Sequence, residues 1–408
     1  MPQTCRHCKS TDSLPFLDLG FAPPSNNYLH PEALNAPELT LPLRLFVCRS
    51  CRLVQTEDFS AADALFDADY AYFSSTSRSW VTHAERYSAV MIDRFALSGD
   101  SHVMELASND GYLLRNFVAA GIPCLGVEPT HAAAEAARGL GIKVVEAFFG
   151  KDLATDLPRA DLIAGNNVFA HVPDINDFSL GMARALKDQG VITLEFPSLL
   201  NLVEKHQFDT VYHEHFSYLS LLSTERILRA AGLRVFDIDQ LTTHGGSLRI
   251  YACHANADHV ETENVTTQRA LEQARGMDGD DFYNGFQTVA EAVKNNFLQF
   301  LLTAHATGKS VAGYGAAAKG NTLMNFAGVR PDLVAFVCDA APSKIGKLLP
   351  GSHIPVLAPD ILHTRAPDYL VIFPWNIASE IISLYGDLAQ RGTKFVTAVP
   401  DLQIRDTA

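Results

Sequence analysis

The sequence has no apolar run that approaches the roughly 18 residues needed to cross a bilayer, so no membrane partner is expected. The opening segment, Met1–Cys8, has no apolar signal core, and we expect a cytoplasmic protein whose thiols stay reduced. Basic residues are also scarce, because 32 Lys and Arg stand against 46 Asp and Glu, a net charge of −14. A chain this acidic is a poor ligand for a phosphate backbone, so nucleic acid is not an expected partner.

The composition is that of an ordinary globular protein, with 408 residues, 47% hydrophobic and 19% charged. It excludes long disorder, collagen and coiled coil, and the length predicts two to four domains. Seven cysteines are an odd number that fits a disulfide framework poorly.

Four of the seven cysteines form two Cys-x-x-Cys pairs, Cys5/Cys8 and Cys48/Cys51. Two such turns offer four thiolates to one tetrahedral zinc ion. A redox pair is the alternative, but thioredoxin-type chemistry needs one pair beside a βαβ pattern, and this region has neither. Since four thiolates fill the coordination sphere, we predict a structural zinc in a module spanning residues 1–62.

The rest of the chain alternates between strand-like and helix-like runs, which predicts α/β domains with parallel sheets. We assign residues 63–282 to a first domain, and residues 283–408 to a second, with a long connecting helix over 283–305. The first domain's expected strands are His102–Ala107, Cys124–Glu128, Lys143–Ala147, Asp161–Gly165 and Val191–Phe196, followed by a hairpin of Arg234–Ile238 and Ser247–His254. Those of the second are Ser310–Tyr314, Leu333–Cys338, Tyr369–Phe373 and Lys394–Val399.

The first domain opens with a strand that runs into a small polar turn, Ala107–Gly111, and then a helix. About 20 residues on, a second strand ends in Glu128, whose carboxylate can accept both hydroxyls of a ribose. This spacing predicts a nucleoside-bearing cofactor, either a nicotinamide dinucleotide or S-adenosylmethionine. The turn lacks Gly-x-Gly-x-x-Gly, and Glu105 suits a methionine ammonium but repels a diphosphate, which favours S-adenosylmethionine.

A second glycine-containing turn, Gly313–Lys319, follows a strand and opens a helix in the second domain. Its backbone and the helix N-terminus favour an anion, and Asp339 ends the next strand about 20 residues further on. Taken alone, this pattern predicts NAD and a dehydrogenase. Anchoring of a nucleotide-linked sugar is the competing interpretation.

Together these motifs resemble the S-adenosylmethionine-dependent sugar C-methyltransferases that act on nucleotide-linked deoxy-ketohexoses, over essentially the whole chain. The matching segments are the two cysteine pairs, Glu105-x-x-x-Asn109-Asp110-Gly111, Ala170–Pro173, Tyr212–Phe216, His244–Gly246 and Gly313–Lys319. One departure is Ala107, where the family usually has glycine; the extra methyl group should be tolerated. The resemblance implies a zinc module, a central class I methyltransferase domain and a C-terminal Rossmann-like domain, with S-adenosylmethionine and structural zinc as cofactors.

The resemblance also implies binding residues. Those for the cofactor are Glu105, Ala107, Asn109, Asp110, Gly111, Glu128, Asn166 and Asn167. Those for a dTDP- or other NDP-linked sugar are Tyr72, Ser74, His244, Gly245, Gly246, Tyr314, Lys319, Lys344, Trp375 and Asn376. The two lysines would meet the diphosphate, which Trp375 and Asn376 would flank.

The implied reaction is methylation of a carbon, expected to be carbon 3, of a 4-keto-deoxysugar. A sugar carbon becomes a nucleophile only after a base removes a proton α to the ketone and a donor stabilises the enolate oxygen. We predict His215 as the base, since histidine titrates near neutrality, and Tyr212 as the donor. Glu214 would orient an imidazole or hold a sugar hydroxyl, and His171 is an alternate base.

Three alternatives stay open from sequence: an N- or O-methyltransferase, an NAD-linked oxidoreductase, and a non-catalytic sugar-nucleotide sensor or scaffold. Each polar residue named above also has a purely structural interpretation. The oligomeric state is not fixed by the sequence, and a monomer is compatible with it.

Overall fold

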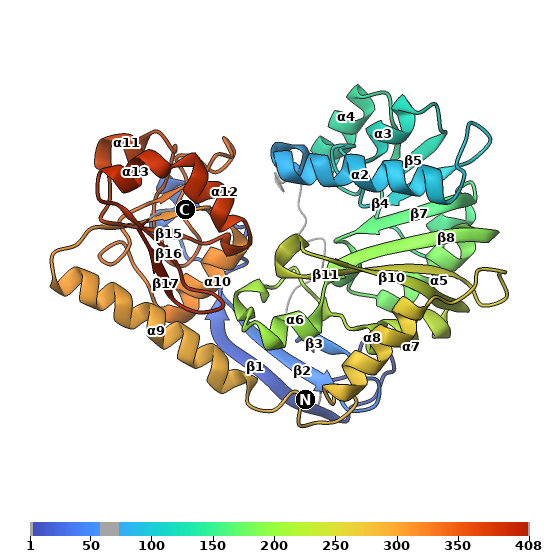
Figure 1. Ribbon diagram of the computed structural model, residues 1–408, viewed down its shortest axis with the longest axis horizontal. Helices are drawn as coiled ribbons and strands as arrows, with labels where there is room; N and C mark the ends of the chain where they lie inside the picture. The colour runs from blue at the N-terminus through green and yellow to red at the C-terminus, as the bar shows by residue number, and fades with distance from the viewer. Residues whose placement is uncertain (1–2, 58–72, 407–408) are drawn as a thin grey trace.

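The computed structural model describes residues 3–57 and 73–406, which form three β-sheets with helices around them (Figure 1). The predicted site residue Tyr72 lies outside the described residues. In Figure 1 two lobes face each other, and the N-terminal strands run beneath them. Among the described residues, no helix has the length and apolar character needed to cross a bilayer.

The largest sheet has seven strands in the order β10-β11-β8-β7-β4-β5-β6. All neighbours are parallel except β11, which is antiparallel to both strands beside it. The strand order reverses beside β4, and ligands of open α/β sheets bind at such a switch point. The strands are β4 (Val103–Leu106), β5 (Cys124–Val127), β6 (Lys143–Val145), β7 (Ala160–Asn166), β8 (Leu186–Pro197), β10 (Leu233–Leu241) and β11 (Ser247–His254).

Helices cover both faces of this sheet, which explains why its strands read as continuous apolar runs. One hydrophobic cluster joins one face to α2, α3 and α4, and another joins the opposite face to α5, α7 and α8. The helices are α2 (Arg78–Arg94), α3 (Leu114–Ala119), α4 (His131–Gly139), α5 (Ile175–Ala185), α6 (Leu199–Glu204), α7 (Leu221–Ala230) and α8 (Glu263–Ala274). Every strand predicted for this part of the chain is confirmed, including the β10–β11 hairpin.

The N-terminal sheet is antiparallel, with the order β1-β2-β3-β9. Its first three strands are β1 (Ser13–Ala22), β2 (Leu41–Cys48) and β3 (Val54–Thr56). The fourth, β9 (Ser217–Tyr218), comes from the middle of the chain and directly follows the predicted catalytic segment Tyr212–Phe216. The cysteine-containing region is therefore joined by strand pairing to the segment that carries the proposed chemistry.

The third sheet has six strands in the order β14-β13-β12-β15-β16-β17, all parallel except β17. They are β12 (Val311–Tyr314), β13 (Val337–Cys338), β14 (Val356–Leu357), β15 (Tyr369–Ile372), β16 (Lys394–Thr397) and β17 (Gln403–Arg405). The helices are α9 (Phe286–Ala306), α10 (Ala318–Ala327), α11 (Ile361–Arg365), α12 (Ala378–Leu384) and α13 (Gly386–Gln390). Of the predicted strand Leu333–Cys338, only the last two residues pair.

The predicted long connecting helix is confirmed as α9, and it packs against two sheets. Phe286 at its start stacks on Phe16 of β1, with ring centroids 4.9 Å apart. Further along, Phe300 meets Tyr369 of β15 edge-on at 5.0 Å. One continuous hydrophobic cluster thus spans the N-terminal and C-terminal sheets and fixes the C-terminal part on the N-terminal sheet.

Candidate active site and metal centre

The four paired cysteines converge on one point. Their Sγ atoms all lie within 4.8 Å of one another, with Cys5–Cys51 at 3.5 Å and Cys8–Cys48 at 3.4 Å. Tetrahedral zinc with 2.3 Å bonds to sulfur requires sulfur–sulfur distances of about 3.8 Å. The arrangement therefore fits a closed, structural zinc site.

Each cysteine pair folds into the same tight turn, here called a knuckle (residues 5–9 and 48–52). The residue after each second cysteine has a left-handed backbone, φ 63° at Lys9 and 62° at Arg52. Its N–H donates to the carbonyl of the first cysteine, at 3.0 Å from Lys9 and 2.8 Å from Arg52. This conformation turns both thiols of a pair toward the same side.

The turn after β4 gathers buried carboxylates at the switch point. Glu105 is only 1% exposed, and burial, together with the neighbouring Glu128 and Asp110, raises its pKa well above the usual value. Glu105 Oε2 and Asp110 Oδ1 are buried without a hydrogen-bond partner in the described part of the chain. Such a site is stabilised by a cationic ligand, which fits the ammonium and sulfonium of S-adenosylmethionine.

The end of β5 fits the ribose of the same cofactor. Glu128 accepts the N–H of Asn109 on Oε2 and the N–H of Thr130 on Oε1, both at 2.9 Å. Glu128 Oε1 also accepts the Thr130 hydroxyl, so three of about four acceptor positions of the carboxylate are taken and one, on Oε2, remains for a ribose hydroxyl. At the end of β7, on the other side of β4, both side-chain polar atoms of Asn166 are buried without a partner among the described residues. Ser74, which the sequence predicts to contact substrate, lies next to this turn and donates its backbone N–H to Asn109 Oδ1 at 2.8 Å.

Ala107 adopts φ 54°, a left-handed conformation that costs a residue with a Cβ about 1–2 kcal/mol. This strain is a physical reason for glycine at this position in the family. We expect Ala107→Gly to raise the free energy of unfolding by about 1 kcal/mol, measured by urea denaturation. Ala96→Gly is the matched control, since exposed Ala96 has φ 48° and should respond alike. A lower urea midpoint for Ala107→Gly would contradict the argument.

Tyr212, His215 and His171, three of the predicted catalytic residues, lie together in one cluster. The Thr210 carbonyl lies 3.1 Å from His215 Nδ1 and can only accept, so Nδ1 carries the proton of the neutral ring. His215 Nε2 then accepts the hydroxyl proton of Tyr212, 2.7 Å away. The His171 ring meets the His215 ring edge-on, with centroids 4.5 Å apart.

The expectation that His215 titrates near neutrality is wrong. The largest cause is burial, which holds the pKa of His215 well below 6.5. The second cause is the repulsion that a proton on His215 would meet from a proton on His171. Burial also lowers the pKa of His171 to about 4, against a hydrogen bond to the Glu214 backbone. Both imidazoles are therefore neutral at pH 7, which is the form that accepts a proton.

Glu214 points to a residue that the sequence analysis missed. Its Oε1 accepts from Asn26 Nδ2 at 3.1 Å, while its Oε2 is buried without a partner in the described part of the chain. Burial raises the pKa of Glu214, partly offset by its hydrogen bonds. Asn26 belongs to the loop after β1, so the N-terminal sheet contributes to the site. In the sequence, Asn26 stands out only because it lies in Pro23–Tyr28, a segment rich in turn-forming residues.

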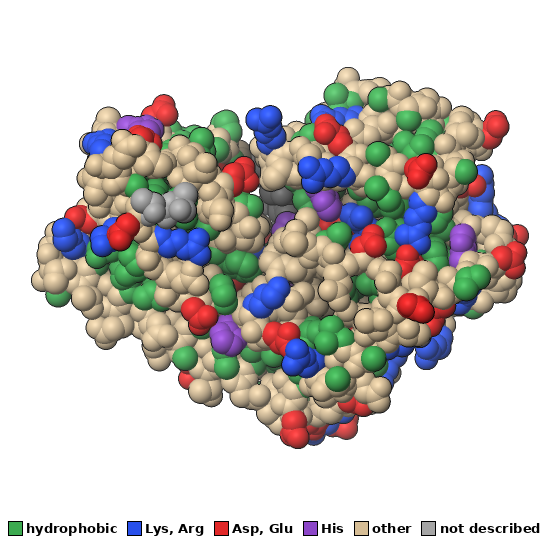
Figure 2. All heavy atoms as spheres, in the orientation of Figure 1, with side chains coloured by type: hydrophobic (Ala, Val, Ile, Leu, Met, Phe, Trp, Pro, Cys, Tyr) green, Lys and Arg blue, Asp and Glu red, His purple; other side chains and the backbone are tan. Residues whose placement is uncertain are grey.

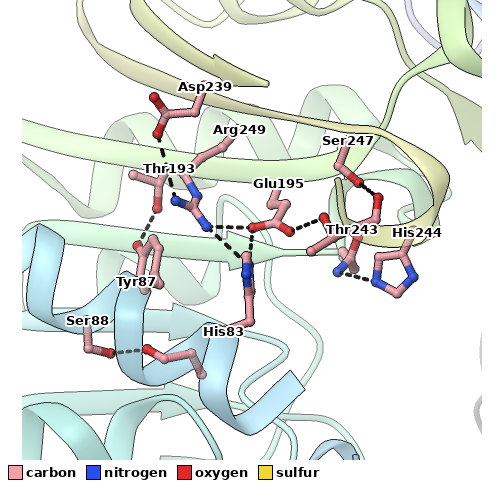
Figure 3. A network of polar contacts seen from close by, with 12 residues as sticks. His83, Tyr87, Ser88, Thr193, Glu195, Asp239, Thr243, His244, Ser247 and Arg249 are labelled. Carbon is pink, nitrogen blue, oxygen red and sulfur yellow. Dashed lines mark hydrogen bonds and ion pairs between the residues drawn. The ribbon is translucent and has the colours of Figure 1, made fainter. Parts of the chain in front are cut away.

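His244 is held by a polar network behind the site (Figure 3). Its Nε2 lies 3.3 Å from Asn167 Nδ2, and the adjacent Thr243 hydroxyl donates to Glu195 Oε1 at 2.9 Å. The other oxygen of Glu195 meets His83 of α2 and Arg249 of β11, each at 2.9 Å. Burial would raise the pKa of Glu195, but these two partners lower it overall. The network thus ties α2, β8 and β11 to the His244 loop.

The C-terminal part closes over this loop from the other lobe. Trp375 Nε1 donates to Asp209 Oδ2 at 2.7 Å, and a Cβ on Gly245 would clash with the Trp375 ring. Lys319 Nζ donates to Asn376 Oδ1 at 3.0 Å and lies 4.4 Å above the Trp375 ring. Figure 2 shows the surface hollowed between the lobes, with histidine side chains at the rim.

Asp209 was also missed by the sequence analysis, although it stands three residues before Tyr212. Burial raises its pKa to about 6, opposed by the charge of Lys319. Its Oδ1 is buried without a partner among the described residues, so it remains available to a ligand hydroxyl.

Other predicted substrate residues lie elsewhere or are already bonded. Tyr314 packs against Tyr385 in a hydrophobic cluster, with ring centroids 5.2 Å apart. Lys344 Nζ donates to the Ala316 carbonyl at 2.7 Å and lies 3.5 Å from Asp339. Gly246 has φ 124° and packs where a Cβ would meet Asn201, which is a structural reason for glycine.

The partly buried His244 predicts a pH-dependent stability. Burial lowers the pKa of His244 to about 4, with the charge of Lys319 as the next cause. Because the unfolded histidine binds its proton near pH 6.5, the stabilisation by neutral His244 is present above that pH and is lost toward pH 4. We expect the cost of His244→Asn, measured by urea unfolding, to shrink by on the order of 3 kcal/mol between pH 7 and pH 4. The buried carboxylates titrate alike in the wild type and in His244→Asn, so their contribution cancels when the two unfolding free energies are subtracted. A cost that is independent of pH would contradict the assignment.

Comparison with known proteins agrees with this geometry in all three parts of the chain. Residues 5–66 match a family described as "Putative zinc binding domain", residues 80–238 a "Methyltransferase domain", and residues 242–400 a "C-methyltransferase C-terminal domain". The C-methyltransferase NovU of Streptomyces niveus is 34% identical over 404 residues, which cover 98% of this chain and 96% of NovU. This chain belongs to the C-methyltransferase family.

Solved structures match the central part of the chain at low similarity. Magnesium protoporphyrin IX methyltransferase from Synechocystis PCC 6803 is 14% identical over 43% of this chain and 79% of its own, with a TM-score of 0.34. An S-adenosylmethionine-dependent methyltransferase from Clostridium acetobutylicum is 11% identical over 43% of this chain and 92% of its own, with a TM-score of 0.35.

The predicted enzyme class is therefore confirmed. The chain is an S-adenosylmethionine-dependent methyltransferase with an α/β fold, a class I methyltransferase domain and an N-terminal four-cysteine zinc module. The dehydrogenase alternative has no support from these matches.

Proposed function

We propose that this C-methyltransferase methylates carbon 3 of a nucleotide-linked 4-keto-deoxysugar. The observation that carries the proposal is the part-buried Tyr212–His215 hydrogen bond of 2.7 Å, which lies beside His171. Methyl transfer to carbon requires removal of a C–H proton and stabilisation of an enolate, whereas an amine or hydroxyl acceptor already has a lone pair. A tyrosine hydroxyl hydrogen-bonded to a buried, neutral imidazole supports the first chemistry.

The proposed proton path runs through Tyr212 to His215. The proton leaves the sugar carbon for the Tyr212 oxygen, while the Tyr212 proton moves to His215 Nε2 along their hydrogen bond. The Thr210 carbonyl accepts from Nδ1 and so stabilises the imidazolium that forms. S-adenosylmethionine supplies an electrophilic methyl group, to which the enolate carbon bonds as the carbon–sulfur bond breaks. His215 thus remains the final proton acceptor, with Tyr212 as the group at the substrate.

Glu214 and Asn26 are proposed to hold a sugar hydroxyl through the free lone pairs of Glu214 Oε2. A sugar hydroxyl held by Glu214 would fix which sugar carbon faces the Tyr212–His215 pair. Proximity of this kind supplies a large part of a typical rate enhancement.

The C-terminal part is proposed to bind the nucleotide. Lys319 stands at the start of α10, where the ammonium and the helix N-terminus both favour a diphosphate. Asp339, which would bind the ribose of a dinucleotide, lies 3.5 Å from Lys344 instead. Binding energy from the remote nucleotide then serves to position the sugar. We also place the enzyme in the cytoplasm, since none of the seven cysteines, which all lie in the described part of the chain, forms a disulfide.

The test is incubation of a panel of nucleotide sugars with methyl-labelled S-adenosylmethionine, followed by mass spectrometry and NMR of the product. We expect one methyl group on carbon 3, and exchange of that C–H with deuterium oxide when the donor is replaced by S-adenosylhomocysteine. A methyl group on oxygen or nitrogen, or no acceptor among 4-keto sugars, would overturn the proposal.

A further inference from the structure

Arg6 lies between the two cysteines of the first knuckle, yet its side chain extends away from the metal site into the protein. The residue is only 7% exposed. We propose that Arg6 is a positioning residue that couples the metal-bound knuckle to the His171–His215 pair. The inference rests on the proposed catalytic function of these histidines, and its test includes a readout that needs no substrate.

The guanidinium of Arg6 contacts a residue within two positions of each histidine. Its Nη1 donates to the carbonyl of Pro173 at 2.9 Å, two residues after His171. Its Cζ lies 5.3 Å from the ring centroid of Phe216, the residue that follows His215. One side chain therefore bridges the two loops whose histidine rings meet at 4.5 Å. Cation–π contacts and bonds to carbonyls of this kind restrict how far the loops can separate.

The backbone of the first knuckle is anchored to the same two regions. The Arg6 N–H donates to Gln55 Oε1 at 2.9 Å, and Gln55 pairs with Ser217 across β3 and β9. The side chain of Asn176 in α5 contacts His7 twice, at 2.8 Å to its ring and 2.8 Å to its carbonyl. A metal that closes the four-thiolate cluster thus fixes the base from which Arg6 extends.

The second knuckle provides an internal comparison. Arg49 follows Cys48 just as Arg6 follows Cys5, so the two arginines occupy equivalent positions. The Arg49 side chain is 45% exposed and forms ion pairs with Asp280 at 2.9 Å and Asp12 at 3.4 Å. Its contacts lie on the surface, away from the histidines. The two arginines thus share a local sequence context but differ in what they position.

Arg6→Met and Arg49→Met test the proposal as a matched pair in the full zinc-loaded chain. We expect both variants to retain one zinc per chain and the wild-type affinity for S-adenosylmethionine, measured by elemental analysis and calorimetry. In Arg6→Met alone, the imidazole ¹⁵N signals of His171 and His215 should shift and broaden. Its kcat should fall on the order of 10- to 100-fold, as expected for misplacement of catalytic groups.

Equal imidazole spectra for Arg6→Met, Arg49→Met and the wild type would overturn the proposal whatever the substrate is. Changed spectra in Arg6→Met with no C-methylation by the wild type would retain the positioning role while the proposed function fails. If Arg6→Met loses zinc, Phe216→Leu replaces it, because that change removes the ring contact without touching the knuckle. Wild-type histidine signals in Phe216→Leu would then overturn the proposal, and shifted signals with full zinc would support it.

Discussion

Tyr212→Phe is expected to lower kcat by about 10²- to 10⁴-fold, the range that a positioned acid–base group contributes. The change removes the hydroxyl that bonds His215 Nε2 at 2.7 Å and leaves the aromatic ring in place. Affinity for S-adenosylmethionine should stay within about twofold, because the acidic cofactor turn is unchanged. The measurements are single-turnover methyl transfer and deuterium exchange at the sugar carbon.

Tyr283→Phe is the matched control for this change. Tyr283 is equally an aromatic hydroxyl with a hydrogen bond of 2.7 Å, to the Met277 carbonyl, but it lies in the core beside the N-terminal sheet. The Tyr283→Phe variant should lose about 1 kcal/mol of unfolding free energy and keep the wild-type kcat. Exchange at more than half the wild-type rate in Tyr212→Phe would contradict the proposed proton path.

His215→Gln should lower kcat by a similar factor. The kcat of the Tyr212→Phe/His215→Gln double variant should be little lower than that of the less active single variant. Two groups that act as one unit are non-additive in this way. Full additivity would show that the two side chains act independently and would assign the base elsewhere, with His171 as the next candidate.

Loss of the metal is expected to cost several kcal/mol of unfolding free energy, since binding to a structural four-thiolate site is coupled to folding. Three of the thiols, those of Cys5, Cys48 and Cys51, lie in the same hydrophobic cluster as Leu219 and Leu221 of the methyltransferase part. Disruption of the cluster should therefore reach β9 and abolish methyl transfer as well. Urea unfolding and activity, before and after chelation, measure both effects.

Cys48→Ser should reproduce the effect of chelation, whereas Cys338→Ser is the matched control. Cys338 is fully buried in the C-terminal sheet but belongs to a different cluster. The Cys338→Ser substitution should lower the unfolding free energy only by the cost of burying a polar group, about 1–3 kcal/mol, and leave zinc bound. Metal-free protein with an unchanged urea midpoint would refute a structural role for the zinc.

The sequence predicted the elements of the central sheet well because local patterns determine them. The strands from Val103 to Phe196 are apolar runs bounded by turn residues, and the β10–β11 hairpin has its glycines at the turn. It did not predict β9, since a two-residue strand has no periodicity to detect. The site residues Asn26 and Asp209 were missed for a related reason, because each acquires its partner from a segment more than 160 residues away.

By itself the sequence determined the chemistry that is available: four thiolates in two turns, three carboxylates at the cofactor edge, and a Tyr-x-Glu-His segment. These are matters of spacing along the chain. Only the tertiary structure decided that Tyr212 donates to His215, that Arg6 donates to the carbonyl of Pro173, and that the pKa of His215 lies well below its usual value. The reason is physical, because burial and long-range contacts arise only when distant segments pack together.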